Sequence, residues 1–152
     1  MAAICGLGGL ISAALGGVAG GYLLVPPLSS KKKEAWTAVG EISRAPIGKP
    51  AEFVFQKTRV DGWKVTKEKA TAWVLKKSEN EVVAFAPQCT HLGCAYHWED
   101  GTNTFVCPCH TSAFSIDGKV LTGPAPRALD QYEVKLDGGK ILVSGIRPAA
   151  NA

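Results

Sequence analysis

Two short motifs, Cys89-Thr90-His91-Leu92-Gly93-Cys94 and Cys107-Pro108-Cys109-His110-Thr111-Ser112, decide the fold of this chain and most of its chemistry. Together they read Cys-x-His, a gap of fifteen residues, and then Cys-x-x-His. Each motif follows an apolar run and is rich in residues that favour turns, so we expect two loops at one end of a β-sheet. Each loop then offers one thiol and one imidazole to a common point.

Two cysteines and two histidines match the ligands of a 2Fe-2S centre in which one iron takes two sulfurs and the other takes two ring nitrogens. Cys89 and Cys107 would hold the inner iron, and His91 and His110 would hold the outer iron and face solvent. Because neutral imidazoles replace two anionic thiolates, such a cluster accepts an electron more readily. Potentials of this class run from about −150 to +300 mV, against about −400 mV for plant-type ferredoxins.

A structural zinc site is the nearest alternative, since zinc also binds two cysteines with two histidines. Zinc motifs usually pair Cys with Cys and His with His along the chain, whereas each pair here is mixed. The spacing therefore favours iron-sulfur over a zinc-binding module without excluding the latter.

Composition limits the class of protein. The chain has 152 residues, enough for one domain of ordinary size, and a net charge of +4 from 17 basic and 13 acidic residues. This balance is mild, and the basic residues form no stripe interleaved with aromatics, so we expect no nucleic-acid partner.

The N-terminus is apolar, and no charged residue occurs before Lys31. A helix over Ala3–Val25 would be about 34 Å long, enough to cross a hydrocarbon core of roughly 30 Å. We therefore predict a membrane anchor at residues 1–25, in contact with lipid, since a cleaved signal peptide would carry a preceding positive segment. Prolines at 26 and 27 are expected to end the helix, and residues 26–35 to form a flexible tether.

Residues 36–152 have the pattern of an all-β head domain, with short β-branched runs separated by Asp-Gly turns. The expected strands are Ala51–Thr58, Thr71–Lys76, Val82–Ala86, Thr104–Cys107, Gln131–Leu136 and Ile141–Val143. The expected core comprises Phe53, Phe55, Trp63, Trp73, Phe85, Val134 and Ile141. This arrangement predicts an antiparallel sandwich or open barrel, and the segment 96–101 reads as a short hairpin between the two motifs.

The two motifs resemble the cluster-binding boxes of the Rieske iron-sulfur subunit of cytochrome bc and b–f type quinol oxidases. Gly123-Pro124-Ala125-Pro126 is similar to the proline loop that shields the cluster in that family. The single anchor and tether agree with it as well. The resemblance implies a Rieske antiparallel β-sandwich with one N-terminal transmembrane helix and a Rieske-type 2Fe-2S cofactor.

The resemblance also assigns roles to further residues. It implies a disulfide between Cys94 and Cys109, a pair that Rieske ferredoxins and dioxygenase domains generally lack. It places five residues around the cluster: Leu92, Gly93, Ser112, Gly123 and Pro124. A disulfide persists on the oxidising side of a membrane, whereas lysines following the span would place the head in the cytoplasm. We give the disulfide more weight and expect the head on the periplasmic or equivalent positive side of an energy-conserving, bacterial inner membrane.

The implied function is quinol oxidation. His91 or His110 would accept a hydrogen bond from the quinol hydroxyl, and one electron and one proton would leave together. The second electron would go to a cytochrome b subunit. The head would then move on its tether to reduce a c-type cytochrome or plastocyanin.

Two positions depart from the family's frequent residues, because Phe114 stands where Tyr is common and Thr111 where Gly is common. A missing tyrosine hydroxyl lowers the potential, so we predict a low-potential substrate such as menaquinol. Two other Rieske carriers stay open as alternatives: the small subunit of a periplasmic oxidase such as arsenite oxidase, and an oxygenase ferredoxin, which the anchor and extra cysteines disfavour.

Overall fold

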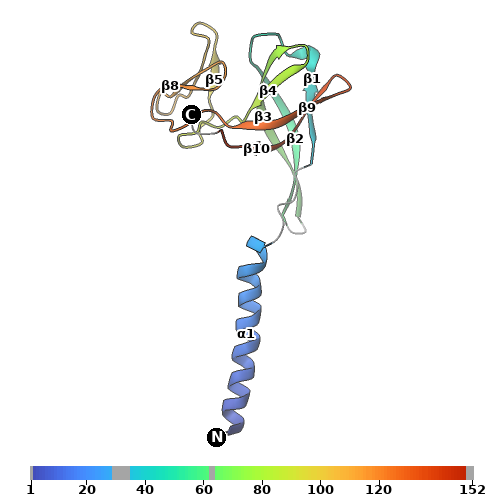
Figure 1. The fold of residues 1–152 in the computed structure, drawn as a ribbon, viewed down its shortest axis with the longest axis vertical. Coiled ribbons are helices and arrows are strands. Elements are labelled where there is room, and N and C mark those ends of the chain that lie inside the picture. The colour runs from blue at the N-terminus through green and yellow to red at the C-terminus, as the bar shows by residue number, and fades with distance from the viewer. Residues whose placement is uncertain (1, 29–34, 62–63, 150–152) are drawn as a thin grey trace. The chain divides into compact units, whose positions relative to one another are not determined.

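The computed structural model describes residues 2–28, 35–61 and 64–149. The chain divides into two units, residues 1–33 and residues 34–152, and each is described by itself (Figure 1).

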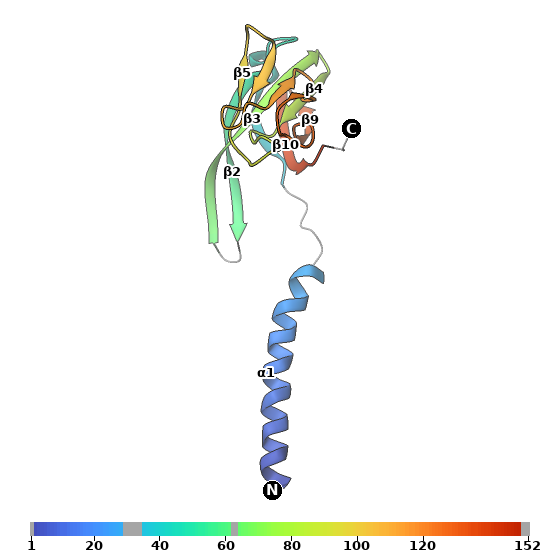
Figure 2. The ribbon, with the colours of Figure 1, turned by 90° about the vertical axis from the view of Figure 1, so that its left-hand side faces the viewer.

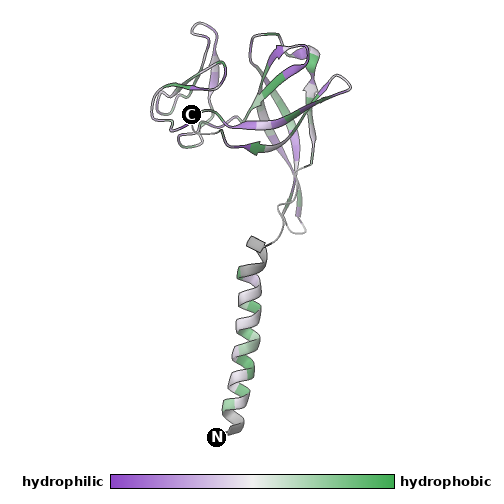
Figure 3. Ribbon diagram, viewed as in Figure 1, coloured by the Kyte–Doolittle hydropathy of each residue, from purple (hydrophilic) through white to green (hydrophobic). Residues whose placement is uncertain are grey.

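The first unit is one helix, α1 (Ala2–Leu28). Its segment Cys5–Leu23 is 19 residues long, apolar, and without any buried share, which makes it a candidate membrane span. Figure 3 shows no strongly hydrophilic residue along its coloured part. The helix continues through Pro26 and Pro27, so our prediction that the prolines end it is wrong. Proline's φ is fixed near the helical value, so the backbone of the last turn can stay helical through both residues. Most of the predicted tether, residues 29–34, lies outside the described residues.

The second unit consists of two antiparallel sheets (Figures 1 and 2). The larger has the order β1-β10-β9-β4-β3-β2, with a 3-10 turn at Ile42–Arg44 after β1. Its strands are β1 (Thr37–Glu41), β2 (Ala51–Asp61), β3 (Lys64–Ser78), β4 (Glu81–Phe85), β9 (Gln131–Asp137) and β10 (Lys140–Arg147). The smaller sheet has the order β5-β6-β7-β8, formed by His97–Glu99, Thr104–Val106, Ala113–Ser115 and Val120–Thr122. The whole smaller sheet is inserted between β4 and β9 of the larger one.

The larger sheet curls until its two edges meet. A Cβ at Gly40 of β1 would lie 2.8 Å from the ring of Phe53 on β2, so only glycine allows this approach. The β9–β10 hairpin closes through Gly138 and Gly139, with φ of 55° and 77°, the backbone that a two-residue hairpin loop requires. The predicted all-β, antiparallel architecture is confirmed.

All six expected strands are found, but four short ones were missed: β1, β5, β7 and β8. Three of these have three residues each, too few for a periodic pattern. The hairpin expected at 96–101 is found only in part, because that segment holds β5 and the start of the turn, whereas the partner strand β6 begins at Thr104, with His97 opposite Val106. Strands β2 and β3 extend well beyond their predicted ends, because their charged outer parts form a solvent-exposed ribbon rather than a buried strand.

Buried side chains form two clusters. One lies within the larger sheet and includes Phe53, Phe55 and Ile141, with Val134 packed against it. The other includes Phe85, Phe105, Phe114, Leu129, Cys89 and Cys107, with Trp73 at its margin. These placements agree with the predicted core, except that Trp63 lies outside the described residues. The second cluster places both predicted cysteine ligands inside a hydrophobic core.

Candidate metal centre

The first loop runs between β4 and β5 and is closed by its own backbone. The amide of Cys89 donates to the carbonyl of Cys94 over 2.8 Å, and the amide of Gly93 donates to the carbonyl of Cys89 over 2.9 Å. Gly93 has a φ of 78°, a left-handed conformation that glycine adopts without strain. His91 and Leu92 therefore lie at the tip of a tight loop.

The second loop connects β6 and β7 and closes in the same way. The amide of Cys107 donates to the carbonyl of Ser112 over 2.9 Å. Thr111 has a φ of 56°, unusual for a β-branched residue, and its hydroxyl donates to the carbonyl of His110 over 2.7 Å. His110 is thereby presented at the loop tip.

The four predicted ligands are sorted by depth. Cys89 and Cys107 are each only 2% exposed, whereas His91 is half-buried and His110 is exposed. The two imidazole rings lie 4.8 Å apart and nearly perpendicular. The structure thus brings the thiols together in the core and the imidazoles together at the surface.

The groups around Cys89 affect how readily its thiol loses its proton to become a metal ligand. Burial raises the pKa of the Cys89 thiol, and the neighbouring Cys107 acts in the same direction. The His91 amide and the Ser112 hydroxyl oppose this pKa shift, because both donate hydrogen bonds to the sulfur. Such donors stabilise a thiolate once a metal replaces the proton.

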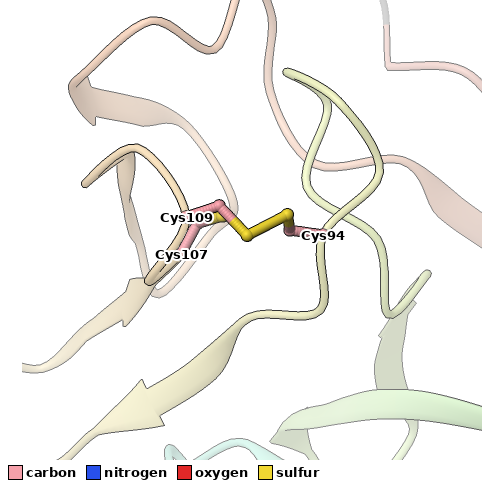
Figure 4. Close-up of side chains that lie close together, drawn as sticks. All are labelled: Cys94, Cys107 and Cys109. Atoms are coloured by element: carbon pink, nitrogen blue, oxygen red, sulfur yellow. A yellow bond between two sulfur atoms is a disulfide. The ribbon is translucent and has the colours of Figure 1, made fainter.

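A disulfide joins the two loops. Cys94 and Cys109 are bonded, with their Cα atoms 6.6 Å apart, as the family resemblance implied. Their sulfurs and that of Cys107 all lie within 4.8 Å of one another (Figure 4). Two of these three sulfurs are consumed by the disulfide, so the trio is not a ligand set. The disulfide instead packs against a buried predicted ligand.

The segment 123–126 lies directly on the second loop. A Cβ at Gly123 would be 2.5 Å from the Cα of Ser112, and Gly123 has a φ of 94°. The amide of Ala125 donates to the Ser112 hydroxyl over 3.2 Å. Ser112 is fully buried as a result, whereas Pro124 and Pro126 are exposed.

Several contacts around the loops were not predicted from the sequence. The Thr90 hydroxyl donates to the carbonyl of Arg127 over 2.6 Å, which ties the first loop to the chain just after segment 123–126. Arg127 forms an ion pair with Asp130, whose carboxylate also accepts the amide of Ala149 over 3.0 Å. These partners are up to 37 residues apart in sequence, so no local motif signals them.

An aromatic group supports the loops from below. The Tyr96 hydroxyl donates to the carbonyl of Ala86 over 2.6 Å, and burial raises the pKa of this phenol. The Tyr96 ring stacks on Trp73 and meets the edge of Phe105. These contacts of Tyr96 fix the base of the first loop.

The donor set fits a 2Fe-2S cluster: a buried cysteine pair with hydrogen-bond donors at its sulfur, and a surface histidine pair. A family model for the Rieske [2Fe-2S] domain matches residues 35–133, more than half of the chain. The chain belongs to the Rieske [2Fe-2S] family. The predicted resemblance and the 2Fe-2S cofactor are confirmed, and the family decides against the zinc alternative.

The chain is similar to iron-sulfur subunits of two kinds of complex. It is 32% identical over 149 residues to the menaquinol:cytochrome c reductase iron-sulfur subunit of Bacillus subtilis, covering 95% of this chain and 88% of that protein. It is 34% identical over 121 residues to the cytochrome b6-f complex iron-sulfur subunit of Chlorobaculum tepidum. That match covers 80% of this chain but only 60% of the relative's length.

Among solved structures, the chain is similar to the plasma membrane Rieske protein PetC3 from Synechocystis PCC 6803, at 28% identity and a TM-score of 0.49. That match covers 72% of this chain and 99% of the other. A hyperthermophilic respiratory Complex III is similar at 29% identity and a TM-score of 0.43, covering 90% of this chain and 97% of that one.

Proposed function

We propose that this chain is the Rieske subunit of a quinol:cytochrome c reductase, which takes one electron and one proton from quinol and passes the electron to a c-type cytochrome. The histidine pair at the protein surface carries the proposal, because it places the acceptor side of the cluster where a substrate can reach it. The names of the relatives from B. subtilis and C. tepidum point to the same class of complex. They give no support to the arsenite oxidase alternative.

In this proposal Cys89 and Cys107 hold the inner iron, and His91 and His110 hold the outer iron. The cluster, when bound, supplies one-electron chemistry at a potential set by the surrounding protein. The Ser112 hydroxyl donates a hydrogen bond to the sulfur of Cys89. Such donors raise the reduction potential of the cluster by stabilising its more negative reduced state.

The proposed quinol-binding site is the exposed edge of the two loops. His110 is the more exposed imidazole, so its outer nitrogen is the better candidate to accept a hydrogen bond from the quinol hydroxyl. Leu92 is 71% exposed and, with Pro124, offers an apolar rim that would exclude water around the quinol. Gly93 and Gly123 let the two backbone segments turn tightly beside it.

The quinol is proposed to be menaquinol. Phe114 is fully buried in the hydrophobic core that also holds Cys89 and Cys107. Its ring has no hydroxyl to donate to the iron-sulfur cluster, which lowers the reduction potential relative to a tyrosine at this position. The relative from B. subtilis, which this chain matches along almost its whole length, is named for menaquinol.

The remaining partners follow from the same proposal. Helix α1 anchors the chain in the bilayer beside a cytochrome b subunit, the segment that follows it forms the tether, and residues 36–152 form the moving head. The Cys94–Cys109 disulfide supports a head domain on the oxidising, positive side of the membrane.

An EPR spectrum of reduced membranes, with and without a quinol-site inhibitor, tests the proposal. We expect a Rieske signal that shifts with the inhibitor, because the inhibitor replaces quinol beside the histidines. His97 serves as a matched control, since it is exposed but lies outside both loops. His97→Gln should keep the signal and the shift, whereas His110→Gln should lose the signal. A Rieske signal indifferent to every quinol-site inhibitor would contradict the proposal.

A further inference from the structure

A paired ribbon formed by the outer parts of β2 and β3 projects from the head domain. Figure 2 shows the two strands running on past the other strands of the sheet. They stay in register to the last pair, Asp61 opposite Lys64, while β3 pairs with β4 only from Trp73 onward. A two-stranded ribbon alone is marginally stable in water, so a projecting one suggests a surface that covers it.

The two faces of this ribbon differ. One face continues from buried Phe55 to charged pairs, in which Lys57 lies opposite Glu68 and Arg59 contacts Glu68 at 3.8 Å. The other face, which we call the outer face, consists of Val54, Gln56, Thr58, Val60, Val65, Lys67, Lys69 and Thr71. The outer face contains no acidic residue.

Apolar and basic side chains are combined on the outer face. Val60 and Val65 are opposite one another at its end and are 58% and 64% exposed. Lys67 and Lys69 follow, both exposed, and within the described residues neither forms an ion pair. Exposed apolar residues at a tip with lysines behind them are typical of segments that lie on an anionic lipid surface.

The net positive charge of this chain is concentrated in two segments. Residues 57–69 contain five basic and two acidic residues, a net +3 in a chain whose total is +4. Residues 31–34, which follow α1, add three lysines and one glutamate. Only eight residues join Leu28 to Thr37, at most about 29 Å of chain, so a bilayer surface is within reach of the head.

The ribbon is remote from the cluster. Trp73 marks the part of β3 that packs on the smaller sheet, through Tyr96 and Phe105. Val65 lies eight residues earlier, about 26 Å along an extended strand. The outer face is therefore not part of the quinol site.

We propose that the outer face of the β2–β3 ribbon docks on anionic phospholipid headgroups at the membrane surface, with Val60 and Val65 at the acyl boundary and Lys67 and Lys69 at the phosphates. Docking covers the ribbon at the bilayer surface. The proposal depends on the anchor but not on the identity of the quinol or the electron acceptor.

Hydrogen–deuterium exchange on the cluster-loaded full chain in lipid nanodiscs tests this. One set of discs is phosphatidylcholine alone, and the other is an equal mixture with phosphatidylglycerol. We expect amides of residues 57–69 to exchange more slowly in the anionic discs, with the difference disappearing at high salt. Because each lysine near such a surface contributes a comparable attraction, Lys67→Glu with Lys69→Glu should weaken docking at least about thirtyfold.

Two controls keep the outcome clear. Lys119→Glu with Lys140→Glu makes the same charge change at exposed positions outside the ribbon and should leave the protection intact. An unchanged Rieske EPR signal shows that each variant is folded, independently of any quinol reaction. Equal exchange in both lipids would overturn the proposal. Protection that required a cytochrome b subunit instead of phosphatidylglycerol would overturn it too, and would assign the ribbon to a protein partner.

Discussion

Gly123→Ala tests how strongly segment 123–126 is pressed onto the second loop. The new Cβ would lie 2.5 Å from the Cα of Ser112 and 2.9 Å from both its amide nitrogen and its hydroxyl oxygen. All of these atoms but the hydroxyl belong to the backbone, so no flexible side chain can move away. The substitution must displace the segment and with it the hydrogen bond from Ala125 to Ser112.

The magnitude has two parts. A non-glycine residue at the positive φ of 94° costs roughly 1–2 kcal/mol. Overpacking adds roughly 1–3 kcal/mol. Gly48→Ala is the matched control, because Gly48 has a φ of 75° but no atom within 4 Å of its would-be Cβ. It should show the first part only.

Thermal unfolding of the cluster-loaded protein, followed by near-UV circular dichroism, measures the difference. For a domain of this size, 1 kcal/mol corresponds to a Tm change of roughly 3–5 °C. Gly123→Ala should therefore melt roughly 3–15 °C below Gly48→Ala, and its Rieske EPR signal should shift while that of the control does not. Equal melting temperatures for the two variants would refute the close packing on which this reasoning depends.

Three further predictions concern other parts of the head. Replacing both Cys94 and Cys109 by Ala should cost about 3 kcal/mol by the chain-entropy estimate, since the bridge spans 15 residues; a reductant should then lower the Tm of the wild type but not of the variant. Phe114→Tyr should raise the midpoint potential measured by voltammetry, and an unchanged potential would remove the argument for menaquinol. A hydrogen bond from Lys49 lowers the pKa of Asp100. The ionised Asp100 carboxylate therefore contributes stability above the ordinary carboxyl pKa, and this contribution is lost as pH falls through the lowered pKa. Asp100→Asn should accordingly flatten the acid side of a curve of Tm against pH.

The fold class could be predicted from the sequence, and the donor set proposed from it, because both depend on local patterns. The Cys-x-His and Cys-x-x-His spacings lie within six-residue motifs, and the longer strands show a clear β pattern. Sequence reasoning could not find the Thr90–Arg127 hydrogen bond, which joins residues 37 apart. The predicted strands for β2 and β3 were also too short, because the segment from Lys57 to Lys69 is highly charged and lacks the alternation of apolar and polar residues that a buried face produces.

The two loops share one construction despite their different spacings. In each, the amide of the buried cysteine bonds to the carbonyl five residues later, Cys89 to Cys94 and Cys107 to Ser112. In each, the fourth residue after the cysteine has a positive φ: 78° at Gly93 and 56° at Thr111. The chain therefore leaves the core at the cysteine, turns at that fourth residue and returns.

The residues between must pass through the loop tip. A histidine two or three positions after the cysteine, as His91 and His110 are, is carried to the surface in either loop. The depth order of sulfurs inside and imidazoles outside thus follows from loop closure alone. The disulfide between Cys94 and Cys109 then fixes one loop to the other, with the two histidine rings 4.8 Å apart and nearly perpendicular.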